Sequence, residues 1–311
     1  MRIVVVGAGA MGCLYGGLLH RAGHDVTLVD VSARQIEAID RDGLVIEMGG
    51  EEVVVPIRAA YASEVTQAPE ALFVFTKTTH TSSALESARP FLGPETTLVS
   101  LQNGLGNVEL MEAFAPRERI VVGVTTFPAD LVSPGRIHTR GGGQTKIMSA
   151  DGALTGRLHE LRDALDEAGF DCHIVPDVQV AIWEKAAFNA GLNTVAAVTR
   201  FPVGRMADSP HARRLAELVV REVTGVARAK GIAADTEAVL ETVTSALAGH
   251  REHKPSMLQD MLAGRRTEIE ALNGAVVREA EALGMTVPAT EALYLLISAL
   301  EAAPAGPEAA A

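Results

Sequence analysis

The chain has 311 residues, 48% of them hydrophobic, which suffices to bury a large core, and its length predicts two domains. Its formal net charge of −12 at pH 7 argues against a nucleic-acid partner, because binding to a phosphate backbone needs a clustered excess of Lys and Arg. The sequence shows no cleavable apolar leader and no run of 18 apolar residues, so we expect neither export nor insertion into a membrane. Its two cysteines, Cys13 and Cys172, are far apart in the sequence and are typical of reduced thiols, so we expect a cytoplasmic protein.

The N-terminal segment predicts a strand, a glycine turn, a helix and a second strand. RIVVV is a β-branched run, AMGCLYGGLLHRAG has apolar residues at helical spacing, and HDVTLVD is the next strand. This context gives weight to a G-x-G-x-x-G motif, which is typical of dinucleotide binding. Gly7 is expected to make the turn, Gly9 to let the backbone approach a pyrophosphate, and Gly12 to let the helix pack on the strand. The pyrophosphate is expected at the helix N-terminus, formed here by Ala10, Met11 and Gly12.

Asp30 ends the second predicted strand, where a carboxylate accepts hydrogen bonds from the adenosine ribose hydroxyls. The same carboxylate repels a 2′-phosphate, so the sequence favours NAD(H). NADP(H) remains the alternative, because the flexible guanidinium of Arg34 follows four residues later.

Further strands are predicted over residues 53–61, 71–78, 97–104 and 119–127, with a helix over 80–92 and a hairpin or glycine-rich loop over 134–143. They continue a doubly wound sheet, whose ligand lies at the carboxyl ends of the strands. Lys77 and Asn103 follow two of these ends, where cofactor and substrate are expected to meet. A solvated loop cation and an ordinary Asn-Gly turn are the alternatives.

The residue pattern changes near residue 170, where short strand-like runs are replaced by long segments rich in Ala, Leu and Glu. Helices are predicted over 176–198, 209–231, 234–249, 255–284 and 288–302. We therefore expect an α/β fold, with a dinucleotide-binding Rossmann domain over 1–169 and an all-α domain for substrate binding and dimerisation over 170–311. Residues 303–311 lack periodicity and are expected to fray.

Lys185, Asn189 and Asn193 lie four residues apart in WEKAAFNAGLN, so they form one polar stripe on an otherwise apolar helix. A stripe on the first long helix after a dinucleotide domain is expected to face the interdomain cleft. Hydride transfer to a ketone requires a proton donor for the carbonyl oxygen, and Lys185 can supply it, while the two amides can hold the substrate's hydroxyl and carboxylate. From this helix alone, a solvated lysine with two surface amides is an equal alternative.

Five segments in register carry a resemblance to a known family. GAGAMG, SLQNG, PGRIHTRGGG, WEKAAFNAGLN and SMLQDMLAGRRTEIEALNG together resemble the ketopantoate reductase family, to about residue 297. The resemblance implies nicotinamide-dependent reduction of 2-dehydropantoate to (R)-pantoate, on the route to pantothenate and coenzyme A. It implies a catalytic Lys185, substrate contacts at Asn189, Asn193, Ser256 and Glu268, and places for Asn103 and Lys77 near the nicotinamide and the substrate carbonyl. Glu268 would keep the Lys185 ammonium charged, so we group these two residues as catalytic.

Two positions depart from the family pattern. Val31 stands where the usual family enzyme has an arginine for the NADPH 2′-phosphate, which supports NAD(H). His253 stands where related reductases carry an asparagine near the substrate, so His253 is a candidate substrate residue. The second interpretation is therefore an NAD-dependent dehydrogenase of another small 2-hydroxy acid or branched alcohol.

Three expectations complete the sequence-based prediction. A non-catalytic dinucleotide-binding regulator is disfavoured, because the polar stripe is intact. No metal is expected, because His250 and His253 have no evident third ligand. Homodimerisation is expected through the helical domain, from its apolar faces and the habit of the family.

Overall fold

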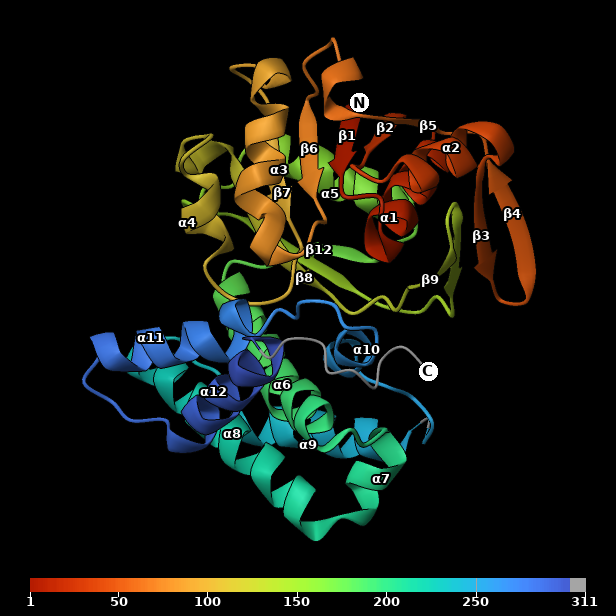
Figure 1. Cartoon of the computed structure of the whole chain (residues 1–311). Helices are drawn as coiled ribbons and strands as arrows, with labels where there is room; N and C mark the ends of the chain where they lie inside the picture. Colours follow the sequence, from red (N-terminus) through yellow and green to blue (C-terminus); the bar gives the residue numbers. More distant parts are fainter. Residues whose placement is uncertain (250, 303–311) are drawn as a thin grey trace. The chain divides into compact units, whose positions relative to one another are not determined.

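The computed structural model describes residues 1–249 and 251–302 and divides into two compact units (Figure 1). The N-terminal unit consists of Met1–Gln102 and Asn107–Val178. The helical unit consists of the chain from Gln179 onward together with the short segment Asn103–Gly106. The boundary expected between residues 169 and 170 is therefore too early, because strand β12 (Cys172–Ile174) still pairs with the sheet of the N-terminal unit. Residues 303–311, which were expected to fray, lie outside the described residues.

The N-terminal unit is built on an eight-stranded sheet in the order β12-β11-β8-β7-β6-β1-β2-β5. All neighbours are parallel except β8 and β11, which run antiparallel. The strands β6, β7 and β8 are buried at every residue, as expected for a sheet covered on both faces. The remaining strand bounds are β1 (Arg2–Val6), β2 (Asp25–Val29), β5 (Arg58–Ala60), β6 (Ala71–Val74), β7 (Thr97–Ser100), β8 (Ile120–Thr125) and β11 (Thr145–Ser149).

The strand order reverses between β1 and β6, which creates a topological switch point at their carboxyl ends. Val6 pairs with Val29 on one side and with Val74 on the other. The backbone N–H of Gly7 donates to Val29 O at 2.8 Å, and Phe75 N–H donates to Val6 O at 2.8 Å. The residues that follow these three strands therefore emerge beside one another, which confirms the doubly wound arrangement.

A second sheet of four strands has the order β4-β3-β10-β9. It contains β3 (Leu44–Met48), β4 (Glu51–Val55), β9 (Asp130–Ser133) and β10 (Arg136–Thr139). The single strand predicted over 53–61 is wrong. Pro56, which has no N–H to donate, separates β4 in this sheet from β5 in the large one. The predicted hairpin near residue 134 is confirmed as the antiparallel pair of β9 and β10.

Five α-helices belong to the N-terminal unit, and α1 packs against both sheets. A Cβ on Gly16 would lie 2.4 Å from the Leu28 side chain of the large sheet, and one on Gly17 would lie 2.7 Å from the Ile46 side chain of the small sheet. The glycine pair therefore lets this helix fit between them. The helices are α1 (Ala10–Arg21), α2 (Ala33–Asp42), α3 (Thr81–Ala88), α4 (Asn107–Met111) and α5 (Gly156–Glu167). Helix α3 confirms the helix predicted over 80–92, with earlier termination.

The helical unit has a core of small and branched apolar side chains, in which Val219, Val220, Val223 and Val226 of α8 are fully buried. The continuous helix predicted over 255–284 is wrong. The observed helix α10 ends at Leu262, and the chain then passes through Gly264 at φ +63°. Helical structure begins again only at a π-helical turn before α11. The elements of the helical unit are α6 (Val178–Thr199), α7 (Val203–Asp208), α8 (Pro210–Ala229), α9 (Thr236–Ala248), α10 (Ser256–Leu262), the π-helix η5 (Glu270–Gly274), α11 (Ala275–Ala282) and α12 (Pro288–Ala302). Among the described residues, no helix has the length and hydropathy to cross a membrane.

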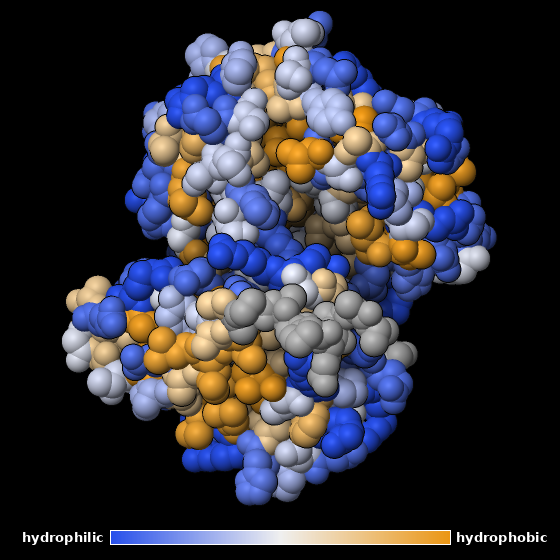
Figure 2. Space-filling view, in the orientation of Figure 1, coloured by the Kyte–Doolittle hydropathy of each residue, from blue (hydrophilic) through white to orange (hydrophobic). Residues whose placement is uncertain are grey.

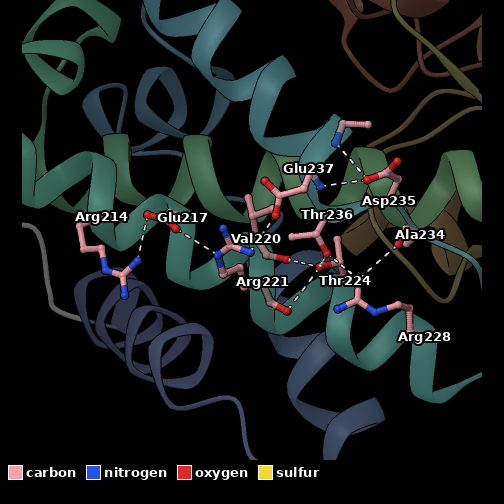
Figure 3. A network of polar contacts seen from close by, with 11 residues as sticks. Arg214, Glu217, Val220, Arg221, Thr224, Arg228, Ala234, Asp235, Thr236 and Glu237 are labelled. Atoms are coloured by element: carbon pink, nitrogen blue, oxygen red, sulfur yellow. Dashed lines mark hydrogen bonds and ion pairs between the residues drawn. The ribbon is translucent and has the colours of Figure 1, made fainter.

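Polar contacts join α8 to the start of α9 (Figure 3). The buried Thr224 hydroxyl donates to Val220 O at 2.9 Å, one turn earlier, and lies 2.8 Å from the Thr236 hydroxyl. Asp235 caps α9 by accepting from the backbone N–H groups of Glu237 and Ala238. This network satisfies the buried hydroxyls and fixes the α8–α9 corner.

Candidate active site

The glycine motif forms a tight loop between β1 and α1. Gly7 has φ +98°, and a Cβ there would lie 2.6 Å from the backbone nitrogen of Thr76. A Cβ on Gly12 would lie 1.9 Å from Gly7 O, so both positions require glycine. A Cβ on Gly9 would meet no atom within 4 Å, and no side chain caps α1 at this residue. The first-turn N–H groups of α1 have no intrahelical acceptor and are suited to an anion.

Asp30 is held at the carboxyl end of β2 by two backbone hydrogen bonds. Its carboxylate oxygens accept from the N–H of Ala8 and of Ser32, each at 2.8 Å. Each oxygen keeps lone-pair capacity for a ribose hydroxyl. The next side chain, Val31, is 93% exposed and brings no charge. Gln35, which the sequence reasoning missed, donates to Ala8 O at 2.7 Å and so braces the loop from α2.

A second missed glutamine, Gln102, joins the ends of β6 and β7. Its amide nitrogen donates to Thr76 O at 2.6 Å, and its amide oxygen accepts from the Ser100 hydroxyl at 2.8 Å. Lys77 and Asn103 are the residues that follow Thr76 and Gln102 in the chain. The only sequence signal was the position of Gln102 directly before the predicted Asn103, since its partners are distant in sequence.

Helix α6 carries the predicted polar stripe. Asn189 and Asn193 are 6% and 7% exposed, and Lys185 is half-buried. The Asn193 amide nitrogen lies 3.4 Å from the side-chain oxygen of Asn189 and 3.4 Å from the hydroxyl of Ser256 at the start of α10. The structure therefore brings together three of the residues predicted to bind substrate, and it excludes the alternative in which both amides lie on a solvated surface.

Two opposing influences act on the pKa of Lys185. Desolvation by burial lowers the pKa of its ammonium to about 8, and the negative charge of Glu268 acts against this shift by favouring the charged form. The pair predicted as catalytic is thus electrostatically coupled within the helical unit, and the lysine can exchange a proton near neutral pH.

Asn103 belongs to the helical unit although it follows β7 in sequence. Two residues later, the Leu105 N–H donates to Ala271 O at 2.8 Å, and Leu105 packs in the helical core. Gly104 lies between them at φ +87°, and a Cβ there would be 2.6 Å from the same Ala271 oxygen. The loop that carries Asn103 is therefore fixed to the segment that follows Glu268.

Two predicted residues have less defined places. Lys77 precedes the short 3₁₀-helix Thr78–His80 in the N-terminal unit. His253 is exposed in the helical unit, and its backbone oxygen accepts from the Val203 N–H at 3.0 Å. The roles of both side chains stay predictions.

A cavity of about 340 Å³ in the N-terminal unit lies away from the glycine loop. Its lining includes Leu14, Leu18, Met48 and Phe127 but none of the residues predicted to bind cofactor. In the part of the chain that the structure describes, which omits His250, no three His, Cys, Asp or Glu side chains are grouped to hold a metal.

The open glycine loop at the switch point, with a fixed acidic residue after β2, is typical of a dinucleotide-binding protein. Comparisons with known families agree. Residues 3–152 match the family model described as "Ketopantoate reductase PanE/ApbA", and residues 177–301 match "Ketopantoate reductase PanE/ApbA C terminal". The chain belongs to the ketopantoate reductase family, which confirms the resemblance. It is an oxidoreductase that acts on CH–OH groups, and its cofactor is a nicotinamide dinucleotide.

Relatives match over nearly the full chain. A 2-dehydropantoate 2-reductase from Pyrococcus horikoshii is 33% identical over 97% of this chain and 98% of its own. A solved 2-dehydropantoate 2-reductase from Geobacter metallireducens is 32% identical, with a TM-score of 0.89 over 96% of this chain and 99% of that chain. The ternary structure of a D-mandelate dehydrogenase with NADH and anilino(oxo)acetate is 29% identical, with a TM-score of 0.91 over 97% of this chain and 98% of that chain.

Proposed function

We propose that this protein reduces 2-dehydropantoate to (R)-pantoate, prefers NADH, and uses Lys185 as the proton donor. The observation that carries the proposal is the place of Lys185 on α6, one turn before the buried Asn189, where desolvation lowers its pKa to about 8 and the charge of Glu268 favours the ammonium. The names of the relatives support the substrate. The product lies on the route to pantothenate and coenzyme A, and we propose that the enzyme works in the cytoplasm.

The N-terminal unit fits a dinucleotide. The first-turn N–H groups at Ala10 and Met11 would receive the pyrophosphate, and Asp30 would accept from the ribose hydroxyls. The preference for NADH rests on the fixed Asp30 carboxylate and on Val31, which offers no cation to a 2′-phosphate. Arg34, exposed on the first turn of α2, is the cation that would support NADPH instead. When bound, the reduced nicotinamide supplies the hydride.

The helical unit supplies binding groups and the proton. Asn189, Asn193 and Ser256 are neutral donors and acceptors suited to the hydroxyl and carboxylate of a small 2-keto acid. As the carbonyl carbon gains its new C–H bond, negative charge grows on the carbonyl oxygen, and the Lys185 ammonium transfers a proton to that oxygen. The lysine is left neutral and regains a proton from water. Glu268 favours the charged ammonium before transfer. General-acid catalysis of this kind contributes roughly 10² to 10⁴ in rate.

A second candidate is oxidation or reduction of another small 2-hydroxy or 2-keto acid with the same residues. The likeness to the D-mandelate dehydrogenase structure with NADH favours it. A branched alcohol belongs to the same alternative. Both candidates use Lys185 in the same role.

A homodimer is proposed from the exposed apolar surface of the helical unit. Leu295, Leu296 and Leu300 of α12 are 56%, 49% and 46% exposed. Figure 2 shows apolar side chains gathered over this region of the helical unit. A surface of this kind is typical of subunit contacts.

The experiment that tests the proposed function is the rate of nicotinamide oxidation with ketopantoate, measured in parallel with NADH and NADPH. Fast turnover with NADH and slow turnover with NADPH is expected. Fast turnover with NADPH alone would contradict the assignment of Asp30. Cofactor binding without turnover on ketopantoate, but with turnover on another 2-keto acid, would favour the second candidate.

A further inference from the structure

Glu268 lies two residues before the first residue of the π-helix η5. The N–H of Gly274 donates to Ile269 O at 2.9 Å, which is a hydrogen bond across five residues rather than four. A π-turn inserts one residue into a helix, is uncommon, and occurs frequently at functional sites.

One contact of η5 reaches the helix that carries Lys185. The Thr194 hydroxyl donates to the side-chain oxygen of Asn273 at 2.8 Å, and both residues are fully buried. Thr194 directly follows Asn193 on α6. A buried threonine in a helix can satisfy its hydroxyl on the carbonyl one turn earlier, as Thr224 does in α8. The bond to Asn273 is therefore not needed to satisfy Thr194 itself.

Asn273 is also costly to bury. Among the described residues, its amide nitrogen has no hydrogen-bond partner. A buried amide nitrogen without an acceptor destabilises the folded state, and an apolar side chain at this place would avoid that cost. Stability alone therefore does not account for an asparagine here, whereas a requirement for the bond to Thr194 does.

A second contact of η5 holds the loop of Asn103. Ala271 O accepts from the Leu105 N–H at 2.8 Å, and Gly104 packs so closely on Ala271 that a Cβ there would lie 2.6 Å from the same oxygen. Within the helical unit, the turn after Glu268 thus contacts both the Lys185 helix and the Asn103 loop.

We propose that η5 is a positioning element for the reduction, and that the Thr194–Asn273 hydrogen bond fixes Glu268 relative to Lys185. Thr194 and Asn273 are positioning residues, since they act through the catalytic pair and need not touch the substrate. The inference rests on the proposed function, because it assigns a role to residues around the proposed proton donor. A misplacement of about 1 Å in such a pair can reduce the rate by about a hundredfold.

The test compares two substitutions at one position. Thr194→Val keeps the shape and removes the hydroxyl, and Thr194→Ser keeps the hydroxyl and removes the methyl group. We expect Thr194→Val to lower kcat on ketopantoate about tenfold, with the Kd for cofactor unchanged, and Thr194→Ser to retain most of the activity. Thr224→Val is the matched control, because it removes another fully buried hydroxyl, on α8. It is expected to lower Tm and leave kcat unchanged.

A second measurement does not depend on the substrate. The rate at which an amine-reactive acylating reagent modifies Lys185, followed by mass spectrometry across pH, reports the pKa of its ammonium. Because Glu268 raises this pKa, a displaced Glu268 should move the midpoint of modification to lower pH in Thr194→Val, but not in Thr194→Ser or Thr224→Val.

The outcomes separate the two claims. Absence of ketopantoate turnover in the wild-type protein would overturn the proposed function, while the modification midpoint would still decide the inference. An unchanged midpoint in Thr194→Val would overturn the inference, as would a loss of Tm with unchanged kcat. A midpoint of modification that shifts in Thr194→Val but keeps its wild-type value in Thr194→Ser would support the inference.

Discussion

At the scale of single residues, Lys185 combines a half-buried position with the negative charge of Glu268. Desolvation alone would favour the neutral amine, and Glu268 partly restores the ammonium, so the pKa lies at about 8. A general acid works best when its pKa is near the operating pH. The two opposing influences therefore give a lysine that is protonated at pH 7 and can still release its proton.

This pKa predicts the pH dependence of the reaction. Reduction needs the protonated lysine, so kcat should be level near pH 7 and fall about tenfold per pH unit well above pH 8. Oxidation of the hydroxy acid needs the neutral amine and should rise over the same range. Steady-state rates from pH 6 to pH 10 in both directions check the signs. A reduction rate that rises through pH 8 would contradict the role of Lys185.

The cofactor preference depends on Asp30 and Val31. The double substitution Asp30→Ser with Val31→Arg removes the carboxylate that would repel a 2′-phosphate and adds a cation for it. We expect the ratio of kcat/KM for NADPH to that for NADH to rise at least tenfold, on the order of 1.4 kcal/mol. Val31→Ala is the matched control and should leave the ratio unchanged. An unchanged ratio in the double variant would place the discrimination elsewhere.

At the scale of elements, α12 depends on a glutamate of another helix. Glu222 of α8 accepts from the N–H groups of Ala289 and Thr290 at 3.0 Å and 2.8 Å, and from the Thr290 hydroxyl at 2.7 Å. It thereby satisfies donors in the first turn of α12, as a capping side chain would.

Glu222→Ala is predicted to lower the free energy of unfolding by about 1–2 kcal/mol, because these donors lose their acceptor. Denaturation by urea measures the loss, and Glu241→Ala, at an exposed glutamate of α9, is the control expected to change stability little. The kcat of the folded Glu222 variant should match the wild type. Equal stability of the two variants would show that the cap contributes nothing.

Elements with local signals were predicted from the sequence, and elements set by distant contacts were not. The glycine loop, Asp30 and the α6 stripe follow from spacing within one or two elements. The break after Leu262 was missed, because residues 255–284 keep helical periodicity across Gly264 and η5. β12 was missed for a different reason. It has only 3 residues, and its pairing with β11 is not visible in a local pattern.

The bracing residues of the site were also beyond sequence reasoning. Gln35, Gln102 and Asn273 are ordinary polar residues in the sequence, and their partners lie 27, 26 and 79 residues away. The proposed roles of Ser256 and Glu268 entered only through the family resemblance, since no spacing rule connects them to Lys185. The structure brings both near α6 residues, and their roles stay proposals.

At the scale of the whole molecule, the exposed leucines of α12 predict self-association. We expect light scattering to give twice the 32.7 kDa chain mass at micromolar concentration. Leu296→Glu should shift the protein toward the monomer, because it places a charge in the apolar surface. Glu241→Ala serves again as the surface control. A wild-type mass of 32.7 kDa over the same concentrations would contradict the homodimer.

Lys185→Ala tests most directly whether Lys185 donates the proton. The kcat for ketopantoate reduction and the affinity for NADH are measured on the wild type and on this variant. The N-terminal unit forms the dinucleotide loop without Lys185, so the variant should bind NADH normally while kcat falls at least a hundredfold. Normal NADH binding with kcat within a few fold of wild type would contradict the account.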